Sequence, residues 1–113
     1  MARLATQAEG ARCMGRRVGD ASVKAEDGGG PPPTIEASEY KLFITEFSKC
    51  LADASMDLGR PGTQLRVCTD EAPMGGRAES TYRYTVLDTI GGGTSEVQKN
   101  ILTRRGLGLP KNF

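Results

Sequence analysis

Small and apolar residues recur at helical spacing near the start of the chain. The intervals of three and four residues predict a helix over 3–26. One face of this helix collects Leu4, Ala8, Ala11, Gly15 and Val18. Three glycines in the segment, Gly10, Gly15 and Gly19, each disfavour a helix by about 1 kcal/mol relative to Ala. We therefore expect the helix to depend on a neighbouring helix, which these small residues would allow to approach closely.

The strongest periodicity follows at 34–58, where apolar residues keep to one helix face over five turns. These residues are Tyr40, Phe43, Ile44, Phe47, Leu51, Ala54 and Leu58. Thr34 is the predicted N-cap, Glu36 complements the helix dipole in the first turn, and Gly59 supplies the C-terminal glycine. Since three of the six aromatic rings lie on this face, we expect it to form the core.

Glycine and proline separate the remaining segments. They mark a linker at 27–33 and a long loop at 59–78. The segment 80–90 is ambiguous, because Tyr82 and Tyr84 alternate as in a strand while Tyr82, Val86 and Ile90 repeat every four residues as in a helix. No other segment offers a strand to pair with it, so a helix is preferred.

Three glycines, Gly91–Gly93, precede a predicted short helix over 96–105. Ser95 and Gln98 fit a capping box, Val97 and Ile101 fit a buried pair, and Gly106 would end the helix. Glycines before a helix N-terminus let the backbone approach an anion or a carbonyl. From the local sequence alone, a capped turn without a ligand is the preferred interpretation. The Lys-Ser/Thr pair that ends a phosphate-binding loop does not follow these glycines.

Composition limits the function classes. The 113 residues carry a net charge of +1 without a basic stripe, so we expect no nucleic-acid partner. We also expect no membrane span, since no run approaches about 18 apolar residues. The absence of His removes the usual near-neutral base and metal ligand, and no metal site is expected. Fifteen glycines, six prolines and few aromatic residues predict a marginal free-standing fold.

The cysteines indicate a reducing compartment. Cys13, Cys50 and Cys68 are odd in number, lie far apart and form no Cys-x-x-Cys pair. This pattern is typical of reduced thiols rather than a disulfide framework. We expect a cytoplasmic bacterial protein, or a mitochondrial matrix protein if the source is eukaryotic.

The glycine motif resembles a known family signature. The sequence TIGGGTSEVQKNIL at 89–102, followed by RRGLGLP at 104–110, resembles the C-terminal signature of acyl-CoA dehydrogenases. The sequence PTIEASEYK at 33–41 is similar to the start of a long helix in the same domain. The resemblance is sharp over 89–110, moderate over 33–58 and faint before that. It implies an all-α, up-down helical bundle over 1–113, with a motif contacting FAD and CoA at 90–105.

The resemblance also implies roles for individual positions. Gly93 would lie beside the acyl-CoA thioester, Arg104 would lie near the CoA adenine, and Thr94, Ser95 and Glu96 would contact FAD. In many members the residue before this glycine is the glutamate that removes the α-proton, but here it is Gly92. No catalytic residue is therefore assigned. A flavin-binding Gln-x-x-Gly-Gly pattern is also absent, and residues 58–62 occupy roughly its place.

Other carboxylates offer no clear substitute for the base. Glu96 lies in the first turn of its helix, where the dipole would lower its pKa. It is interpreted as a polar residue of the helix start, and Asp88 and Glu79 as surface carboxylates. The first function hypothesis is accordingly an FAD- and acyl-CoA-contacting domain of an acyl-CoA dehydrogenase-like flavoprotein, inactive as this chain alone.

Two alternatives stay open. One is a non-catalytic helical subunit that completes the flavin site of a partner in a hetero-oligomer. The other is a truncated reading frame without an independent role. By resemblance, the partners would be acyl-CoA, further acyl-CoA dehydrogenase-like chains in a homo- or hetero-oligomer, and electron-transfer flavoprotein. The resemblance also implies a role in fatty-acid or sterol catabolism.

Overall fold

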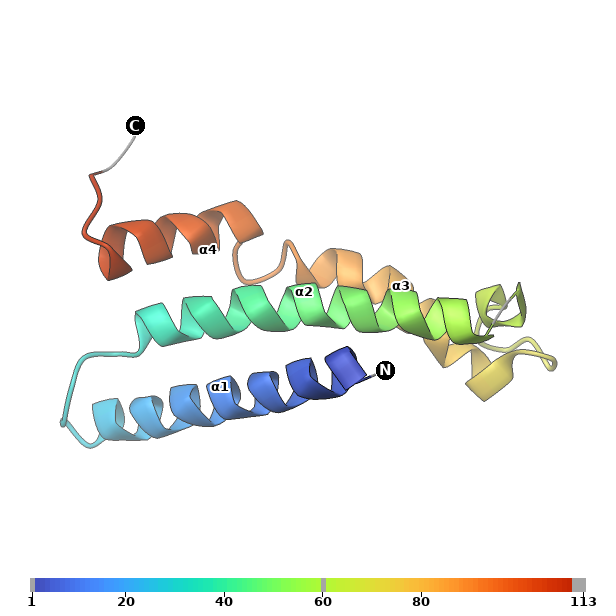
Figure 1. Cartoon of the computed structure of the whole chain (residues 1–113), viewed down its shortest axis with the longest axis horizontal. Coiled ribbons are helices and arrows are strands. Elements are labelled where there is room, and N and C mark those ends of the chain that lie inside the picture. Colours follow the sequence, from blue (N-terminus) through green and yellow to red (C-terminus); the bar gives the residue numbers. More distant parts are fainter. Residues whose placement is uncertain (1, 60, 111–113) are drawn as a thin grey trace. The chain divides into compact units, whose positions relative to one another are not determined.

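The computed structural model describes residues 2–59 and 61–110 (Figure 1). These described residues form four α-helices: α1 (Ala2–Glu26), α2 (Thr34–Gly59), α3 (Arg77–Asp88) and α4 (Ser95–Ile101). Two 3₁₀ turns, η1 (Pro61–Gln64) and η2 (Pro73–Gly76), lie between α2 and α3, and a π-helical turn, η3 (Leu102–Gly106), continues α4. Since the described ranges contain no strand, the predicted all-α class is confirmed, as is the helical preference at 80–90.

The chain divides into two compact units. The first unit comprises residues 1–44 and 93–113, and the second comprises residues 45–92. The first therefore holds α1, the start of α2, α4 and η3, and the second holds the rest of α2, both 3₁₀ turns and α3.

A glycine turn ends α1 and leads into the prolines before α2. Gly28, with φ of +74°, donates its N–H to the Ala25 carbonyl, and Gly29 donates to the Lys24 carbonyl at 2.8 Å. This pattern is the Schellman motif, which satisfies the last carbonyls of the helix. After the prolines, the Thr34 hydroxyl donates to the Pro32 carbonyl at 3.4 Å. Thr34 is thus the first helical residue, and its predicted N-cap role is wrong.

Helices α1 and α2 pair in antiparallel fashion within the first unit (Figure 1). A Cβ at Gly10 would contact the Phe43 ring at 3.7 Å, and one at Gly15 would contact the Tyr40 ring at 3.4 Å. Two of the three glycines thus lie where the helices approach, as predicted. Gly19 has no neighbour within 4 Å of its Cβ position, so its predicted contact is wrong.

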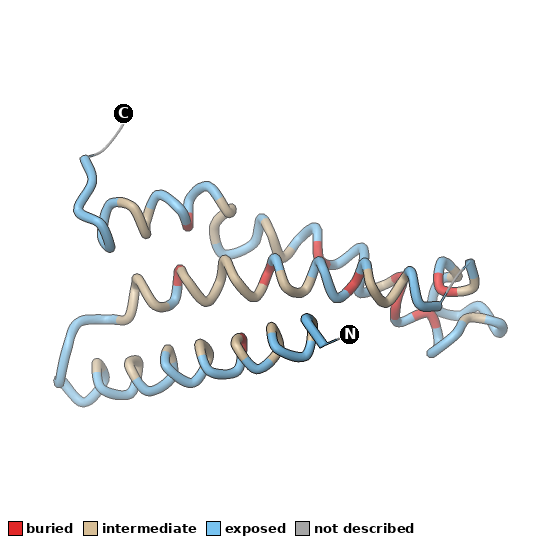
Figure 2. The backbone as a smooth tube through the Cα atoms, in the orientation of Figure 1, coloured by how far each residue is buried: buried red, intermediate tan, exposed pale blue. Residues whose placement is uncertain are grey.

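The buried positions of α2 are small residues at intervals of seven. Ser38 is 4% exposed, Thr45 is 6% exposed and Ala52 is 2% exposed. Figure 2 marks the buried positions of the chain in red. The aromatic residues of the predicted stripe are only half-buried. Leu51 and Leu58 are exposed, so their predicted core positions are wrong. The enclosed positions of α2 are therefore small side chains rather than the large apolar ones that its hydrophobic pattern favours.

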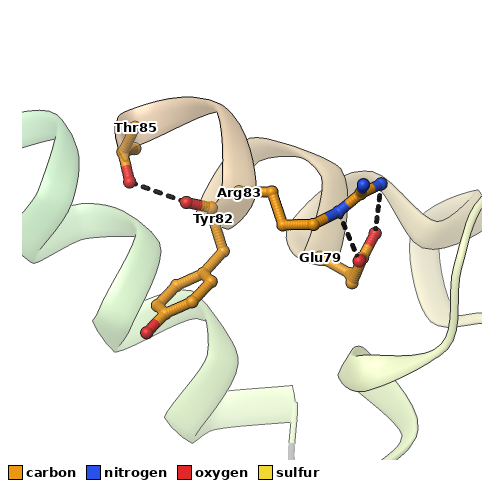
Figure 3. A network of polar contacts seen from close by, with 4 residues as sticks. All are labelled: Glu79, Tyr82, Arg83 and Thr85. Carbon is orange, nitrogen blue, oxygen red and sulfur yellow. Dashed lines mark hydrogen bonds and ion pairs between the residues drawn. The ribbon is translucent and has the colours of Figure 1, made fainter. Parts of the chain in front are cut away.

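Helix α3 also turns small or polar residues inward. Ala78 and Thr85 are buried, as is Glu79, although a surface position was predicted for it. Glu79 accepts from the Arg83 Nε at 2.6 Å and from Nη2 at 3.2 Å, which neutralises the buried carboxylate (Figure 3). The Thr85 hydroxyl donates to the Tyr82 carbonyl at 2.7 Å. The larger apolar residues of this segment are exposed, namely Tyr82, Tyr84, Val86, Leu87 and Ile90.

The hydrophobic core is consequently thin. Among the described residues, the buried hydrophobic ones are all alanines: Ala11, Ala52 and Ala78. Alanine contributes little apolar area, so hydrophobic burial stabilises this chain weakly. No helix in the described ranges combines the length and the apolar character needed to cross a bilayer.

Candidate ligand-contact site

The glycine turn before α4 has a conformation that requires glycine. Gly92 has φ of +68° and Gly93 has φ of +97°, both in a region that side chains disfavour. A Cβ on Gly93 would also lie 2.9 Å from the Gln98 Nε2. Gly91 donates its N–H to the Leu87 carbonyl at 2.7 Å. The turn itself therefore accounts for glycine at 92 and 93, without a ligand.

Thr94, rather than Ser95, caps α4. The Thr94 hydroxyl accepts from the Val97 N–H at 3.4 Å, and α4 begins at Ser95. The predicted capping box, which makes Ser95 the N-cap, is therefore wrong, because the N-cap lies one residue earlier. Both Thr and Ser are good caps, so the local sequence does not distinguish the two registers. Val97 is exposed, and the predicted burial of this side chain is also wrong.

The three residues expected to contact FAD are consecutive at this helix start. Thr94 and Ser95 are half-buried, and Glu96 is exposed. Hydrogen bonds from its own backbone N–H and from the Thr94 side chain, together with the nearby Lys99 charge, lower the pKa of Glu96. Two hydroxyls and an ionised carboxylate suit the sugar hydroxyls of a flavin nucleotide. The same carboxylate disfavours a diphosphate, so these residues fit only the hydroxyl-bearing part of FAD.

A cavity lies at the other end of the first unit. It measures about 430 Å³ and is lined by Lys24 of α1, the residues 29–36 that lead into α2, and Arg105 of η3. The backbone N–H groups of Ile35 and Glu36 have no hydrogen-bond partner in the described part of the chain. The lining also holds the Glu36 carboxylate, so its side chains carry two positive charges and one negative charge. This net positive charge and the two free donors of the helix start together favour an anionic ligand.

Sequence reasoning missed this cavity. Lys24 and Arg105 are far apart in the sequence, and only the fold brings them together. A partial signal was present, because the prolines before Thr34 marked the helix start and Arg104 was already expected near CoA. Arg104 lies next to Arg105 in η3 and is exposed. Gly106 of the same turn places its Cβ position 3.8 Å from the Ile35 Cγ2, so η3 packs against the start of α2.

The candidate bases do not form a proton-abstracting site. Gly92 has no side chain, the lowered pKa of Glu96 makes it a weaker base, and Glu79 is bound to Arg83. In the described ranges, no three metal-ligating side chains gather as a metal centre. Cys13, Cys50 and Cys68 are exposed free thiols.

The comparisons with known proteins agree on one family. The profile of the acyl-CoA dehydrogenase C-terminal domain matches residues 1–107. Acyl-CoA dehydrogenase FadE26 of Mycobacterium tuberculosis is 31% identical over 111 residues, which cover 98% of this chain and 27% of that protein. Acyl-CoA dehydrogenase IpdE1 of the same organism is 36% identical over 74 residues, which cover 63% of this chain and 17% of that protein.

The chain thus spans about a quarter of the length of FadE26, the relative that it matches over most of its own length. No solved structure matches significantly. With the sequence profile extending over nearly the whole chain, the chain belongs to the acyl-CoA dehydrogenase family and corresponds to its C-terminal domain.

Proposed function

We propose that this chain is the FAD- and acyl-CoA-contacting helical domain of an acyl-CoA dehydrogenase-like flavoprotein. The observation that carries the proposal is the cavity between Lys24, Arg105 and the start of α2. CoA is strongly anionic because of its phosphate groups. In this proposal the two cations and the free N–H groups of Ile35 and Glu36 hold a phosphate, while Arg104 on the same turn contacts the nucleotide.

The start of α4 would serve the second ligand. Thr94 and Ser95 offer hydroxyls to the sugar chain of the flavin nucleotide, and Glu96 accepts hydrogen bonds from its hydroxyl groups. Gly93 would lie beside the thioester. FAD, when bound, supplies the acceptor for the hydride that leaves the acyl chain. The residues of this chain bind and orient, and none of those assigned here removes the α-proton.

The chain by itself is therefore proposed to be inactive in α,β-dehydrogenation. Gly92 cannot accept a proton, and the lowered pKa of Glu96 disfavours it as a substitute. The second candidate, a non-catalytic subunit completing the flavin site of a partner, is favoured by one observation. The large apolar residues of α3 are exposed rather than packed in the core, as in a surface that another chain covers.

Calorimetric titration with CoA tests the binding proposal. We expect the double variant K24Q/R105Q to bind CoA at least about tenfold more weakly, because charge-assisted hydrogen bonds contribute about 1.5–3 kcal/mol. The variant R16Q removes an exposed cation of the same unit outside the cavity and should bind as the unchanged chain does. Equal affinity in all three proteins would contradict the proposal.

Two further measurements separate the candidate functions. The chain mixed with FAD and an acyl-CoA should not reduce an artificial electron acceptor, and reduction would contradict its inactivity. Copurification with a longer acyl-CoA dehydrogenase-like chain, in a complex that contains flavin, would favour the subunit. Recovery of the chain alone after gel filtration with such a partner would count against the subunit.

A further inference from the structure

A second hollow lies entirely within the second unit. It is a groove of about 550 Å³ between the C-terminal half of α2, the turn η2 and the start of α3. Volumes of about 300–1,000 Å³ are typical of sites for small molecules. The apolar part of its lining includes Leu51 and Leu58 of α2 and Met74 of η2, all three of which are exposed. Leu51 and Leu58 are side chains that the hydrophobic pattern of α2 would place in a core.

The polar part of the lining is sparse. Among the residues that the structure describes, Arg77 is the one charged residue in this lining, and none of them contributes a carboxylate. Its guanidinium makes no ion pair or hydrogen bond within the described ranges. The hydroxyls of Ser48 and Thr81 also line the groove. Neither hydroxyl has a hydrogen-bond partner among the described residues. The described residues of the groove thus combine an apolar lining, the free hydroxyl donors of Ser48 and Thr81, and the unpaired cation of Arg77.

Arg77 is not placed where it stabilises its own helix. It is the first residue of α3, where the positive end of the helix dipole disfavours a cation. Helix stability therefore does not account for an arginine here. An anion bound beside Arg77 would be attracted both by the guanidinium and by the helix start.

Met74 at the edge of the groove has a strained backbone. Its φ of +54° and ψ of +27° are left-handed, a conformation that non-glycine residues rarely adopt and that occurs preferentially at ligand-binding positions. Its side chain is 77% exposed. The flexible thioether of methionine adapts to irregular apolar shapes, so Met74 can close over an apolar chain lying in the groove.

From these observations we propose that the groove binds a small anionic amphiphile, namely a carboxylate with an aliphatic chain. The aliphatic chain lies along Leu51, Leu58 and Met74, and the carboxylate binds Arg77, with Ser48 or Thr81 donating further hydrogen bonds. The charge of the lining selects an anion over a neutral lipid. The site is separate from the proposed CoA cavity, because no residue is shared between the two linings.

Titration with dodecanoate below its micelle concentration tests this site. We expect one molecule to bind per chain, about tenfold more weakly in R77Q, since a hydrogen-bonded ion pair is lost. The control K49Q removes an exposed cation from α2 outside the groove and should leave the affinity unchanged. Dodecanol, which lacks the charge, should bind weakly and equally to the unchanged chain and to R77Q. Far-ultraviolet circular dichroism checks that each variant is folded.

A second variant keeps the test independent of Arg77. Ser55 lines the groove and is half-buried, so S55L should fill part of it and abolish dodecanoate binding. K24Q/R105Q should bind dodecanoate normally, which separates this site from the CoA proposal. No saturable binding, or equal affinity in R77Q and the unchanged chain, would overturn the proposal. So would sedimentation equilibrium showing a dimer that L58D dissociates and dodecanoate does not, because a second copy would then occupy the groove.

Discussion

Gly76 lies against the backbone nitrogen of Val67, and a Cβ built on Gly76 would overlap that atom. The same glycine has φ of +75° and is the N-cap of α3. Two independent requirements, space and backbone conformation, therefore demand glycine here. The contact fixes the start of α3 against the loop that precedes it.

Replacing Gly76 by Ala should destabilise the chain by about 3 kcal/mol. About 1–2 kcal/mol arises from the left-handed conformation and the rest from displacing the loop. G75A is the matched control, because Gly75 has φ of +64° but nothing within 4 Å of its Cβ position. Its cost should be only about 1 kcal/mol. Urea unfolding followed by circular dichroism measures both, and equal losses would show that the contact with Val67 is unimportant.

The two possible caps of α4 can be distinguished by mutation. T94A should lower the free energy of unfolding by about 1 kcal/mol, since the Thr94 hydroxyl accepts from the Val97 N–H. S95A should change it by less than about 0.5 kcal/mol, because Ser95 lies inside the helix. The same unfolding measurement applies. A larger loss in S95A than in T94A would instead support Ser95 as the N-cap, as predicted from the sequence.

The lowered pKa of Glu96 predicts an acid-dependent contribution to stability. Since its pKa in the folded chain lies below the ordinary value of 4.5, the ionised form stabilises the fold above that value. This contribution disappears as the pH falls through the lower folded pKa. E96Q should therefore melt at a lower temperature than the unchanged chain at pH 7, and the difference should shrink as the pH falls below 4.5. A difference that stays constant across melting curves from neutral to acidic pH would contradict the linkage.

Gly19 offers a stabilising substitution. Because nothing lies within 4 Å of its Cβ position in α1, G19A should stabilise the chain by about 1 kcal/mol through helix propensity. G15A should gain less, because its Cβ would meet the Tyr40 ring at 3.4 Å. Thermal unfolding of both variants gives the comparison. A larger gain for G15A would mean that the Tyr40 ring moves aside without cost.

Helix positions were predictable from the sequence because periodicity, caps and breakers are local. The start of α2 after the prolines and its end at Gly59 agree with the sequence pattern. The buried face was less predictable. Hydrophobicity favours Leu51 and Leu58, but the buried positions are small residues such as Thr45 and Ala52. Which face is covered depends on the neighbouring elements, and a periodic pattern contains no information about these.

The candidate site was predictable only where its residues are contiguous in the sequence. The glycine turn and the residues after it are contiguous, so a motif can identify them. The cavity joins Lys24 to Arg105 through the fold, and no local spacing connects these residues. The burial of Glu79 was missed because burial depends on neighbours that a local pattern does not specify, although its partner Arg83 lies one helical turn away.

The seven-residue spacing of Ser38, Thr45 and Ala52 has a consequence for natural variation. In this chain the small side chains are the enclosed ones, and several large apolar side chains are exposed. A deep mutational scan of the chain alone should therefore give an inverted tolerance map. Leu58 would accept polar replacements, whereas a larger side chain such as Val at Ala52 would be selected against. If the same scan were performed with a ligand or a partner chain covering the exposed apolar residues, polar replacements at these residues would be selected against as well.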